Sequence, residues 1–233
     1  MEQCLLSIDW DYFIYTQKNC GSYIENNRSL MDSWYKRYIQ AKVWGEDILH
    51  EFQLSSQLDT FWEKVRKSFL FAAGIKVLVS DSHALSYQMA KDNNCDAVYL
   101  FDAHSDLGYG GLSALNFEVN CSNWLGKLLK DQQIQGAYIF YSPYTVEKPE
   151  YFQPMNRIYN IRYCDWKDLG GKSIVVTAIH ICRSGAWTPP WLDENFYQFV
   201  DRLGLPYTIE NCPERNWDPD HINLSQQINY LMA

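Results

Sequence analysis

The stretch from residue 75 to residue 142 alternates between continuous apolar runs and segments with helical periodicity. The runs IKVLVSD, DAVYLFD and GAYIFYS predict strands at 75–81, 96–102 and 136–142, and the segments between them predict helices at 83–93 and 121–133. Strands with continuous apolar runs are buried on both faces, and strands separated by helices pair in parallel. The chain is therefore predicted to form a three-layer α/β/α fold with a mostly parallel central sheet.

Further elements are predicted on both sides of this stretch. They are strands at 4–8, 157–164 and 173–182, and helices at 30–44, 56–73 and 189–204. Gly74 is the predicted stop of the second of these helices. The tail from 205 to 233 is polar and poorly periodic, and no linker or repeat divides the chain, so a single domain over 1–233 is expected.

Composition excludes several classes of protein. With 233 residues, 47% of them hydrophobic, the chain is long enough to bury a core. A net charge of −8 argues against binding to nucleic acid, which needs clustered Lys and Arg, and fits metal ions or cationic substrates better. The seven scattered cysteines predict neither a disulfide framework nor a thiolate zinc site. Without a signal peptide or an apolar run of about 18 residues, no membrane association and a cytoplasmic location are expected.

The segment FDAHSD places Asp102, His104 and Asp106 at two-residue intervals directly after an apolar strand. Alternate side chains of a strand share one face, so this spacing predicts that two carboxylates and an imidazole converge. Two other predicted strand ends carry similar groups: Asp9 and Asp11 in SIDWD, and His83 in SDSH. Taken singly, the Asp pair is more typical of a solvated strand end and His83 of a helix start.

Together, the three strand ends predict a metal centre. In an open parallel sheet, ligands bind in the crevice beyond the carboxyl ends of the strands, where these groups would meet. So many carboxylates repel one another without a cation, and a set of oxygen and imidazole donors without thiolate favours Mn²⁺. Six donors suit two ions about 3.5 Å apart with bridging carboxylates. We therefore expect two Mn²⁺ ions bound by six residues: Asp9, Asp11, His83, Asp102, His104 and Asp106.

These segments resemble the metal motifs of the ureohydrolase superfamily, which includes the arginases and agmatinases. DAHSD matches the DAHxD motif in full, SDSHALS is similar to the histidine motif without its glycines, and SIDWDYF is similar to the SxDxD motif. The resemblance covers only these short segments of the first half. The SxDxD-like segment opens this chain instead of following DAHxD, and this order, with the later stretch ICRSGAWTPP, is most similar to the peptide arginases of ribosomal peptide natural-product biosynthesis.

The resemblance implies an arginase-like fold with a rearranged motif order and a role for each ligand. It makes Asp9 and Asp102 bridges between the ions, His83 and Asp106 ligands of one ion, and His104 and Asp11 ligands of the other. It further implies that a metal-bridging hydroxide attacks the guanidinium carbon of an arginine in a precursor peptide, giving ornithine and urea. Asp106 is then the candidate that relays a proton to the departing amine.

Five other residues have two interpretations each. His180 could replace the proton-shuttle histidine that the stretch NCSNWLG lacks, or be a satisfied core residue. Arg183 is a substrate clamp or an ion-pair partner. Asn120 and Ser122 are substrate contacts or helix caps, and Glu46 holds the guanidinium or stabilises a helix N-terminus.

Other functions stay open on the sequence alone. The same site would serve an enzyme acting on free arginine or agmatine, on a formimidoyl compound, or on acyl-lysine as in related deacetylases, because surrounding loops choose the substrate. A non-enzymatic, metal-stabilised binding module is a third class. The oligomeric state is not predicted.

Overall fold

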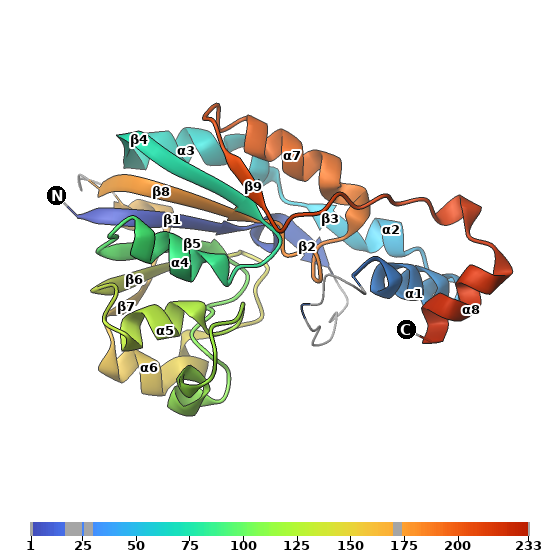
Figure 1. Cartoon of the computed structure of the whole chain (residues 1–233), viewed down its shortest axis with the longest axis horizontal. Helices are drawn as coiled ribbons and strands as arrows, with labels where there is room; N and C mark the ends of the chain where they lie inside the picture. The colour runs from blue at the N-terminus through green and yellow to red at the C-terminus, as the bar shows by residue number, and fades with distance from the viewer. Residues whose placement is uncertain (1, 17–24, 26–29, 170–173, 233) are drawn as a thin grey trace.

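A seven-stranded, fully parallel sheet forms the centre of the computed structural model, which describes residues 2–16, 25, 30–169 and 174–232 (Figure 1). The strand order is β7-β6-β5-β1-β8-β4-β9. The strands are β1 (Gln3–Asp9), β4 (Phe69–Ser80), β5 (Ala97–Asp102), β6 (Gly136–Tyr141), β7 (Ile161–Tyr163), β8 (Ile174–Cys182) and β9 (Thr208–Glu210). The predicted three-layer fold with a mostly parallel sheet is confirmed.

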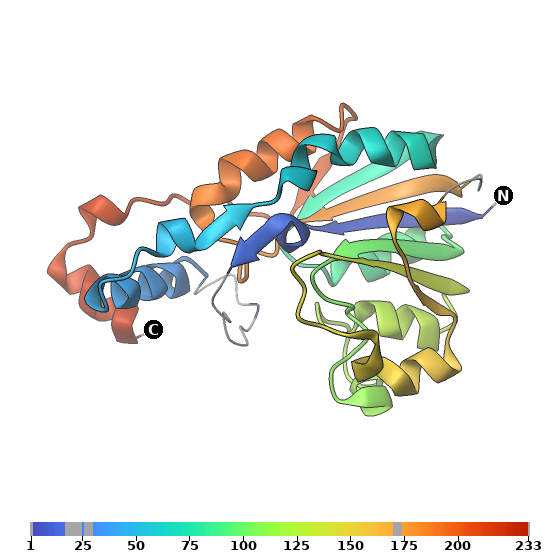
Figure 2. The ribbon, with the colours of Figure 1, turned by 180° about the vertical axis from the view of Figure 1, so that it is seen from behind.

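Helices cover both faces of the sheet, because its strands carry apolar side chains on both sides. In β1, Leu6 and Ile8 belong to one core cluster and Leu5 to the other. The first face is covered by α3 (Phe61–Ser68) and α7 (Asp193–Asp201). The opposite face is covered by α4 (Leu85–Asp92), α5 (Trp124–Lys130) and α6 (Gln153–Ile158) (Figures 1 and 2).

The order of the strands creates a crevice at the carboxyl end of β1. From β1 the chain passes over β8 to β4, and from β4 it returns to pair β5 with the other edge of β1. Connections that leave the central strand in opposite directions open such a crevice outside the strand ends. The segments that follow β1, β4, β5 and β8 therefore meet at one place.

Several predicted element boundaries are wrong. The helix predicted to reach residue 73 ends at Ser68, and β4 begins at Phe69. Gly74 does not stop a helix; it lies inside β4 with a φ of +72°, where the pairing with β8 shifts register. Residues 69–71 pair with 174–176 of β8, and this long-range pairing overrides local helical periodicity. The strand predicted to start at 157 starts at 161, because α6 extends to Ile158.

An arm extends beyond the carboxyl-end side of the sheet (Figure 1). It contains α1 (Leu30–Val43), α2 (Ile48–Glu51) and, from the tail predicted to be irregular, α8 (Leu224–Met232). Tyr35 of α1 stacks on Trp217 and Tyr230. The antiparallel pair β2 (Ile14–Thr16) and β3 (Phe52–Leu54) joins the arm to the sheet region. Short 3-10 turns are η1 (Trp10–Phe13), η2 (Ser56–Thr60), η3 (Gly111–Asn116), η4 (Pro149–Phe152), η5 (Trp166–Leu169), η6 (Pro190–Leu192) and η7 (Pro219–His221).

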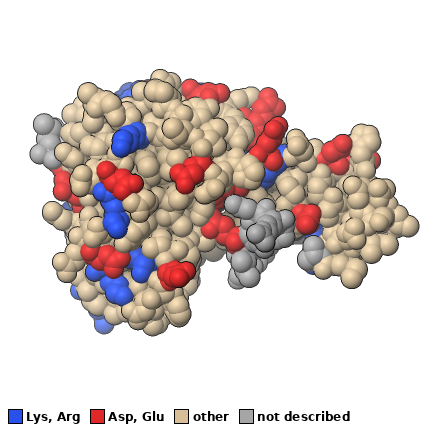
Figure 3. Space-filling view, viewed as in Figure 1, with Lys and Arg blue, Asp and Glu red and all other residues tan. Residues whose placement is uncertain are grey.

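Charge is unevenly distributed over the face shown in Figure 3. Blue Lys and Arg side chains lie mostly on the left of this face, interspersed with red Asp and Glu side chains, and further red side chains continue along the upper edge toward the arm. Among the residues that the structure describes, no helix has the length and apolar character needed to cross a membrane.

Candidate metal centre

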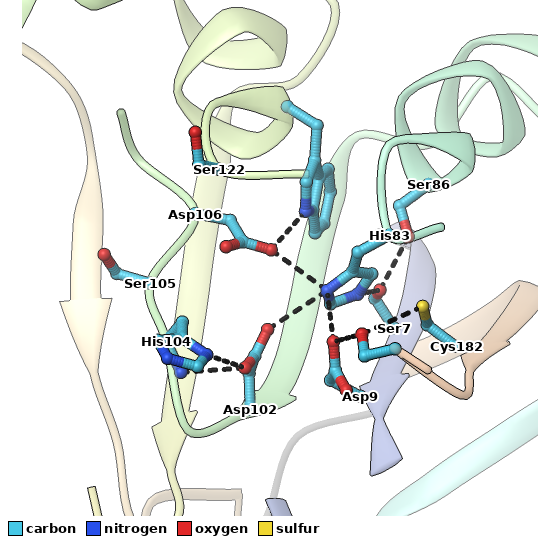
Figure 4. Close-up of polar contacts among 12 residues, drawn as sticks. Ser7, Asp9, His83, Ser86, Asp102, His104, Ser105, Asp106, Ser122 and Cys182 are labelled. Carbon is cyan, nitrogen blue, oxygen red and sulfur yellow. Dashed lines mark hydrogen bonds and ion pairs between the residues drawn. The ribbon is translucent and has the colours of Figure 1, made fainter. Parts of the chain in front are cut away.

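The carboxyl ends of β1, β4 and β5 bring three carboxylates around one nitrogen of His83 (Figure 4). The His83 Nδ1 atom lies 3.1 Å from Asp9 Oδ2 and 3.1 Å from Asp102 Oδ2. It lies 3.0 Å from Asp106 Oδ2. All four side chains are buried. The segments at the ends of these three strands therefore bring their carboxylate and imidazole groups together, as the sequence predicts.

A second group shares Asp102 with the first. His104 Nδ1 lies 2.9 Å from Asp11 Oδ2 and 3.5 Å from Asp102 Oδ1. The side chain of His104 is 38% exposed, so this group faces the opening of the crevice. Asp102 thus offers Oδ2 to the His83 group and Oδ1 to the His104 group. Both groups could hold a metal ion, and the shared carboxylate lies between them.

The route by which DAHSD converges differs from the prediction. Only Asp102 belongs to β5; His104 and Asp106 lie in the loop that follows. Asp106 reaches His83 because its backbone is left-handed, with a φ of +51°, a conformation that costs energy outside glycine. A tight turn, not strand alternation, therefore directs these side chains to one point.

Burial and mutual repulsion perturb the acidic groups of the centre. Burial, with the neighbouring Asp11, Asp106 and Asp9, raises the pKa of Asp102 well above its usual range. Burial alone would lower the pKa of His83, but the carboxylates around it raise the pKa well above the ordinary value. Without a cation, this crevice must hold protons to reduce its negative charge.

Two buried atoms of the centre lack hydrogen-bond partners among the described residues. They are His83 Nδ1 and Asp102 Oδ2, which lie 3.1 Å apart as an ion pair without the geometry of a hydrogen bond. An unsatisfied buried polar atom is costly, and such atoms in a native structure call for an explanation such as an ion. A divalent cation would bind both atoms at once. Carboxylate and imidazole donors without thiolate suit a hard ion of the Mn²⁺ type.

Neighbouring side chains hold the carboxylates in place. Trp124 donates its Nε1–H to Asp106 Oδ2 at 2.6 Å. Ser184, whose φ is +51°, donates its hydroxyl to Asp9 Oδ2. Outer hydrogen bonds of this kind fix the orientation of metal ligands. Neither residue was predicted as part of the site, because each reaches it from a different strand or helix end.

His180, predicted as a catalytic residue, lies behind His83 and not in the crevice. It is fully buried in β8, with Nδ1 2.5 Å from Ser86 Oγ and Nε2 2.8 Å from Ser80 Oγ. Burial, together with the charge of His83, lowers its pKa well below the ordinary value. Ser7 Oγ connects the two histidines, 2.7 Å from His83 Nε2 and 2.8 Å from Ser86 Oγ. His180 is thus a satisfied core histidine, not a group in reach of a substrate.

Arg183 is buried and paired, as in the second interpretation of this residue. Its guanidinium donates to both Asp81 oxygens at 2.9 and 2.8 Å. It also donates to Asp193 Oδ2 at 3.2 Å and to the Pro213 carbonyl at 2.7 Å. These bonds turn the side chain toward α7 and the C-terminal segment. Arg183 therefore forms a structural ion pair and does not point into the crevice as a substrate clamp would.

The other predicted substrate contacts lie outside both metal groups. Asn120 Oδ1 accepts hydrogen bonds from the Ser122 backbone N–H at 3.0 Å and from its hydroxyl at 2.7 Å, in the turn before α5. These bonds form a turn ahead of the helix; the N-cap residue of α5 is Asn123, which makes no capping bond with its side chain, so neither Asn120 nor Ser122 caps the helix. Glu46 is exposed in the turn between α1 and α2, on the arm. Its neighbour Asp47 caps α2 by accepting the Leu49 N–H.

Two glutamates near the crevice were not predicted. Glu147 follows β6 and accepts the Ser105 N–H at 3.0 Å and the Tyr109 hydroxyl. Glu25 accepts the Ser82 hydroxyl at 2.9 Å, and its buried Oε1 has no hydrogen-bond partner among the described residues. Burial raises the pKa of Glu25 to about 7. Glu147 could have been predicted as part of the site because it follows the carboxyl end of a fourth parallel strand. No feature of the sequence indicated Glu25.

Comparison of the chain with protein-family models, with curated proteins and with solved structures found no match. The likeness to ureohydrolases therefore rests on the three short motifs.

Proposed function

We propose that this chain is a hydrolase with two Mn²⁺ ions that converts arginine side chains of a precursor peptide to ornithine and releases urea. The observation that carries the proposal is the convergence of three buried carboxylates on His83 Nδ1 at 3.0–3.1 Å, where neither His83 Nδ1 nor Asp102 Oδ2 forms a hydrogen bond of good geometry with the described residues. The substrate is inferred from the motif resemblance to peptide arginases.

The six predicted ligands fall into two sets joined by Asp102. The first ion would be held by Asp9, His83, Asp102 and Asp106, and the second by Asp11, Asp102 and His104. When bound, the pair of ions would supply Lewis acidity and an activated water. Asp9 directs Oδ2 to His83 of the first set, and its Oδ1 accepts the backbone N–H of Asp11 of the second set.

The residues of the chain would bind the substrate and move its protons. A guanidinium is a planar cation, and a carboxylate with a free oxygen binds it well. Glu25, which is held by the Ser82 hydroxyl and whose Oε1 has no hydrogen-bond partner among the described residues, is our candidate for this contact. In the overall reaction, a guanidinium and one water give urea and the protonated amine of ornithine. Asp106, fixed by Trp124, would pass a proton from the water to that amine.

The test combines metal analysis with a product assay. The purified protein, loaded with Mn²⁺, is incubated with an arginine-containing peptide, and we expect two ions per chain, urea, and a peptide lighter by CH₂N₂. Free arginine, agmatine and an acetyl-lysine peptide complete the panel, in which a loss of C₂H₂O would indicate deacetylation. Less than one ion per chain, with no product from any substrate, would contradict the proposal.

A further inference from the structure

We propose that Ser7, Ser86, His180 and Ser80 are positioning residues that keep a proton on His83 Nε2 and so reserve Nδ1 for the metal. This inference rests on the proposed metal centre and extends it to a layer of residues that no substrate or ion touches. The four residues continue in one line from His83 into the protein (Figure 4 shows its first members).

The far end of this line fixes its direction. Ser80 Oγ lies 2.9 Å from the Ser82 carbonyl oxygen, which can only accept, so the Ser80 hydroxyl must donate to it. Were the hydroxyl turned toward His180, two oxygens would face each other at that distance with no proton between them. Ser80 therefore accepts from His180, and the proton of that bond belongs to His180 Nε2.

The remaining bonds then follow one by one. A neutral His180 with its proton on Nε2 has only an acceptor at Nδ1, so Ser86 donates to it. Ser86 Oγ in turn accepts from the Ser7 hydroxyl, and Ser7 Oγ accepts from His83 Nε2. Of the two neutral forms of His83, this direction permits only the one with Nδ1 free. It also permits the fully protonated ring that the carboxylates favour without metal.

The position of the line explains why it can control His83. Ser7, Ser80 and His180 lie on the face of the sheet that α4 covers, His83 and Ser86 reach them from the α4 side, and each of the five has a relative exposure of 1% or less. Ser7 and His180 lie side by side in the register of β1 and β8, which are central strands. Buried hydroxyls that cannot turn to water keep the hydrogen bonds that the fold gives them.

The first experiment reads the proton positions directly and needs no metal. Nitrogen-15 NMR of the wild-type protein labelled at histidine should show His180 as neutral with its proton on Nε2; the resonances are assigned by their loss in His180→Gln. A proton on His180 Nδ1 would overturn the proposal. Ser80→Ala removes the terminal donor and acceptor, and we expect it to release His180 into a mixture of both forms.

The second experiment measures Mn²⁺ affinity by calorimetry. Ser86→Ala cuts the line, and its Kd for Mn²⁺ should rise about 10- to 100-fold, as for other losses of outer hydrogen bonds around a metal ligand. Ser55→Ala is the matched control: it also removes a buried serine hydroxyl, one that caps η2, and should keep the wild-type Kd.

The results separate the two proposals. Equal Mn²⁺ affinity of Ser86→Ala and wild type would overturn the positioning role and leave the metal centre intact. No Mn²⁺ binding by the wild-type protein would contradict the metal centre itself, together with the part of this inference that concerns metal, whatever form His180 takes.

Discussion

Two buried acidic clusters lie at the same edge of the sheet, and they are neutralised in different ways. One is the ion-pair network at the ends of β4 and β8, in which Asp81 and Asp193 meet Arg183 and Arg215. The other is the candidate metal centre at the ends of β1 and β5. Its carboxylates are faced by two imidazoles and by no guanidinium that the structure describes.

The difference shows which cluster is complete. Every oxygen of Asp81 is used by Arg183 or by the Gly185 N–H, so that network is satisfied by the chain alone. In the metal centre, His83 Nδ1 and Asp102 Oδ2 are ion-paired at 3.1 Å, but neither makes a hydrogen bond of good geometry with any residue that the structure describes. Burying charge is costly unless it is paired. A chain that supplies two arginines to one cluster and none to the other is consistent with an external cation in the second.

The largest effect is expected from Asp102→Asn, because this carboxylate faces both groups. The substitution keeps the shape but removes the charge that two ions would share. We expect urea release to fall by on the order of 1,000-fold or more and Mn²⁺ content to drop below one ion per chain. The assays are urea formation and metal analysis. Asp193→Asn, in the ion-pair network, is the control that should retain its metal; the reverse pattern would exchange the roles of the two clusters.

Arg183→Met should have the next largest effect, on stability instead of metal binding. It leaves Asp81 buried without its partner, which costs about 3–5 kcal/mol. Denaturation by guanidinium chloride measures this loss, and the double variant Asp81→Asn/Arg183→Met should recover part of it. If the single variant were as stable as wild type but had a raised KM for peptide, Arg183 would be a substrate clamp after all.

The metal-free protein should lose stability as the pH rises from about 4 to 8. The pKa values of Asp9, Asp102 and Glu25 are raised in the folded state, chiefly by burial, so these groups stabilise the fold below their unfolded pKa values, and that stability is lost as pH rises through the folded values. For Glu25 the window ends near 7. The raised pKa values of His83 and His104 act in the same direction above about 6.5.

The size of this loss should be about 1–3 kcal/mol, measured by chemical denaturation at several pH values in the presence of a chelator. Saturating Mn²⁺ should reverse the trend, because ligands bind metal in their deprotonated forms, and add about 2.7 kcal/mol at 100 times its Kd. Metal-free stability that increases over this pH range would contradict the description of the centre as an uncompensated acidic cluster.

The smallest effect is expected from Glu25→Gln. Replacing a carboxylate that holds a guanidinium by a neutral amide should raise KM for an arginine peptide about tenfold, near 1.4 kcal/mol, with Mn²⁺ affinity unchanged. Steady-state kinetics measures the change, and Glu150→Gln, at an exposed position of η4, is the matched control. An unchanged KM would remove Glu25 from substrate binding.

Much of the sheet and of the metal centre could be predicted because the decisive patterns are local. Continuous apolar runs between helical segments specify parallel strands, and acidic residues at their carboxyl ends all lie along one edge of such a sheet. The end of α3 could not be predicted in this way. The sequence FLFAAG continues a helical period, and only its pairing with residues 174–176 makes it a strand.

The line of hydrogen-bonded residues behind His83 shows a second limit of prediction from the sequence. Ser7 shares a strand face with Asp9, which two-residue alternation could have indicated. Its contact with Ser86 and the position of His180 beside it depend on α4 covering this face and on β8 lying next to β1. No short motif specifies the order of the strands. The sequence could therefore identify His180 as a candidate, but it could not predict that His180 lies behind His83.

The position of β1 bears on when the centre can assemble. This strand precedes all the others of the sheet along the chain, yet its two neighbours are β5 and β8. The ribosome must therefore translate nearly to residue 182 before β1 has a strand on both sides. Until then, Asp9 and Asp11 follow a strand with one open edge. All six proposed ligands precede residue 107, but Ser184, which holds Asp9, follows β8, so the complete centre forms only after β8 has joined the sheet. Growth medium depleted of manganese should then yield folded protein that can be loaded afterwards.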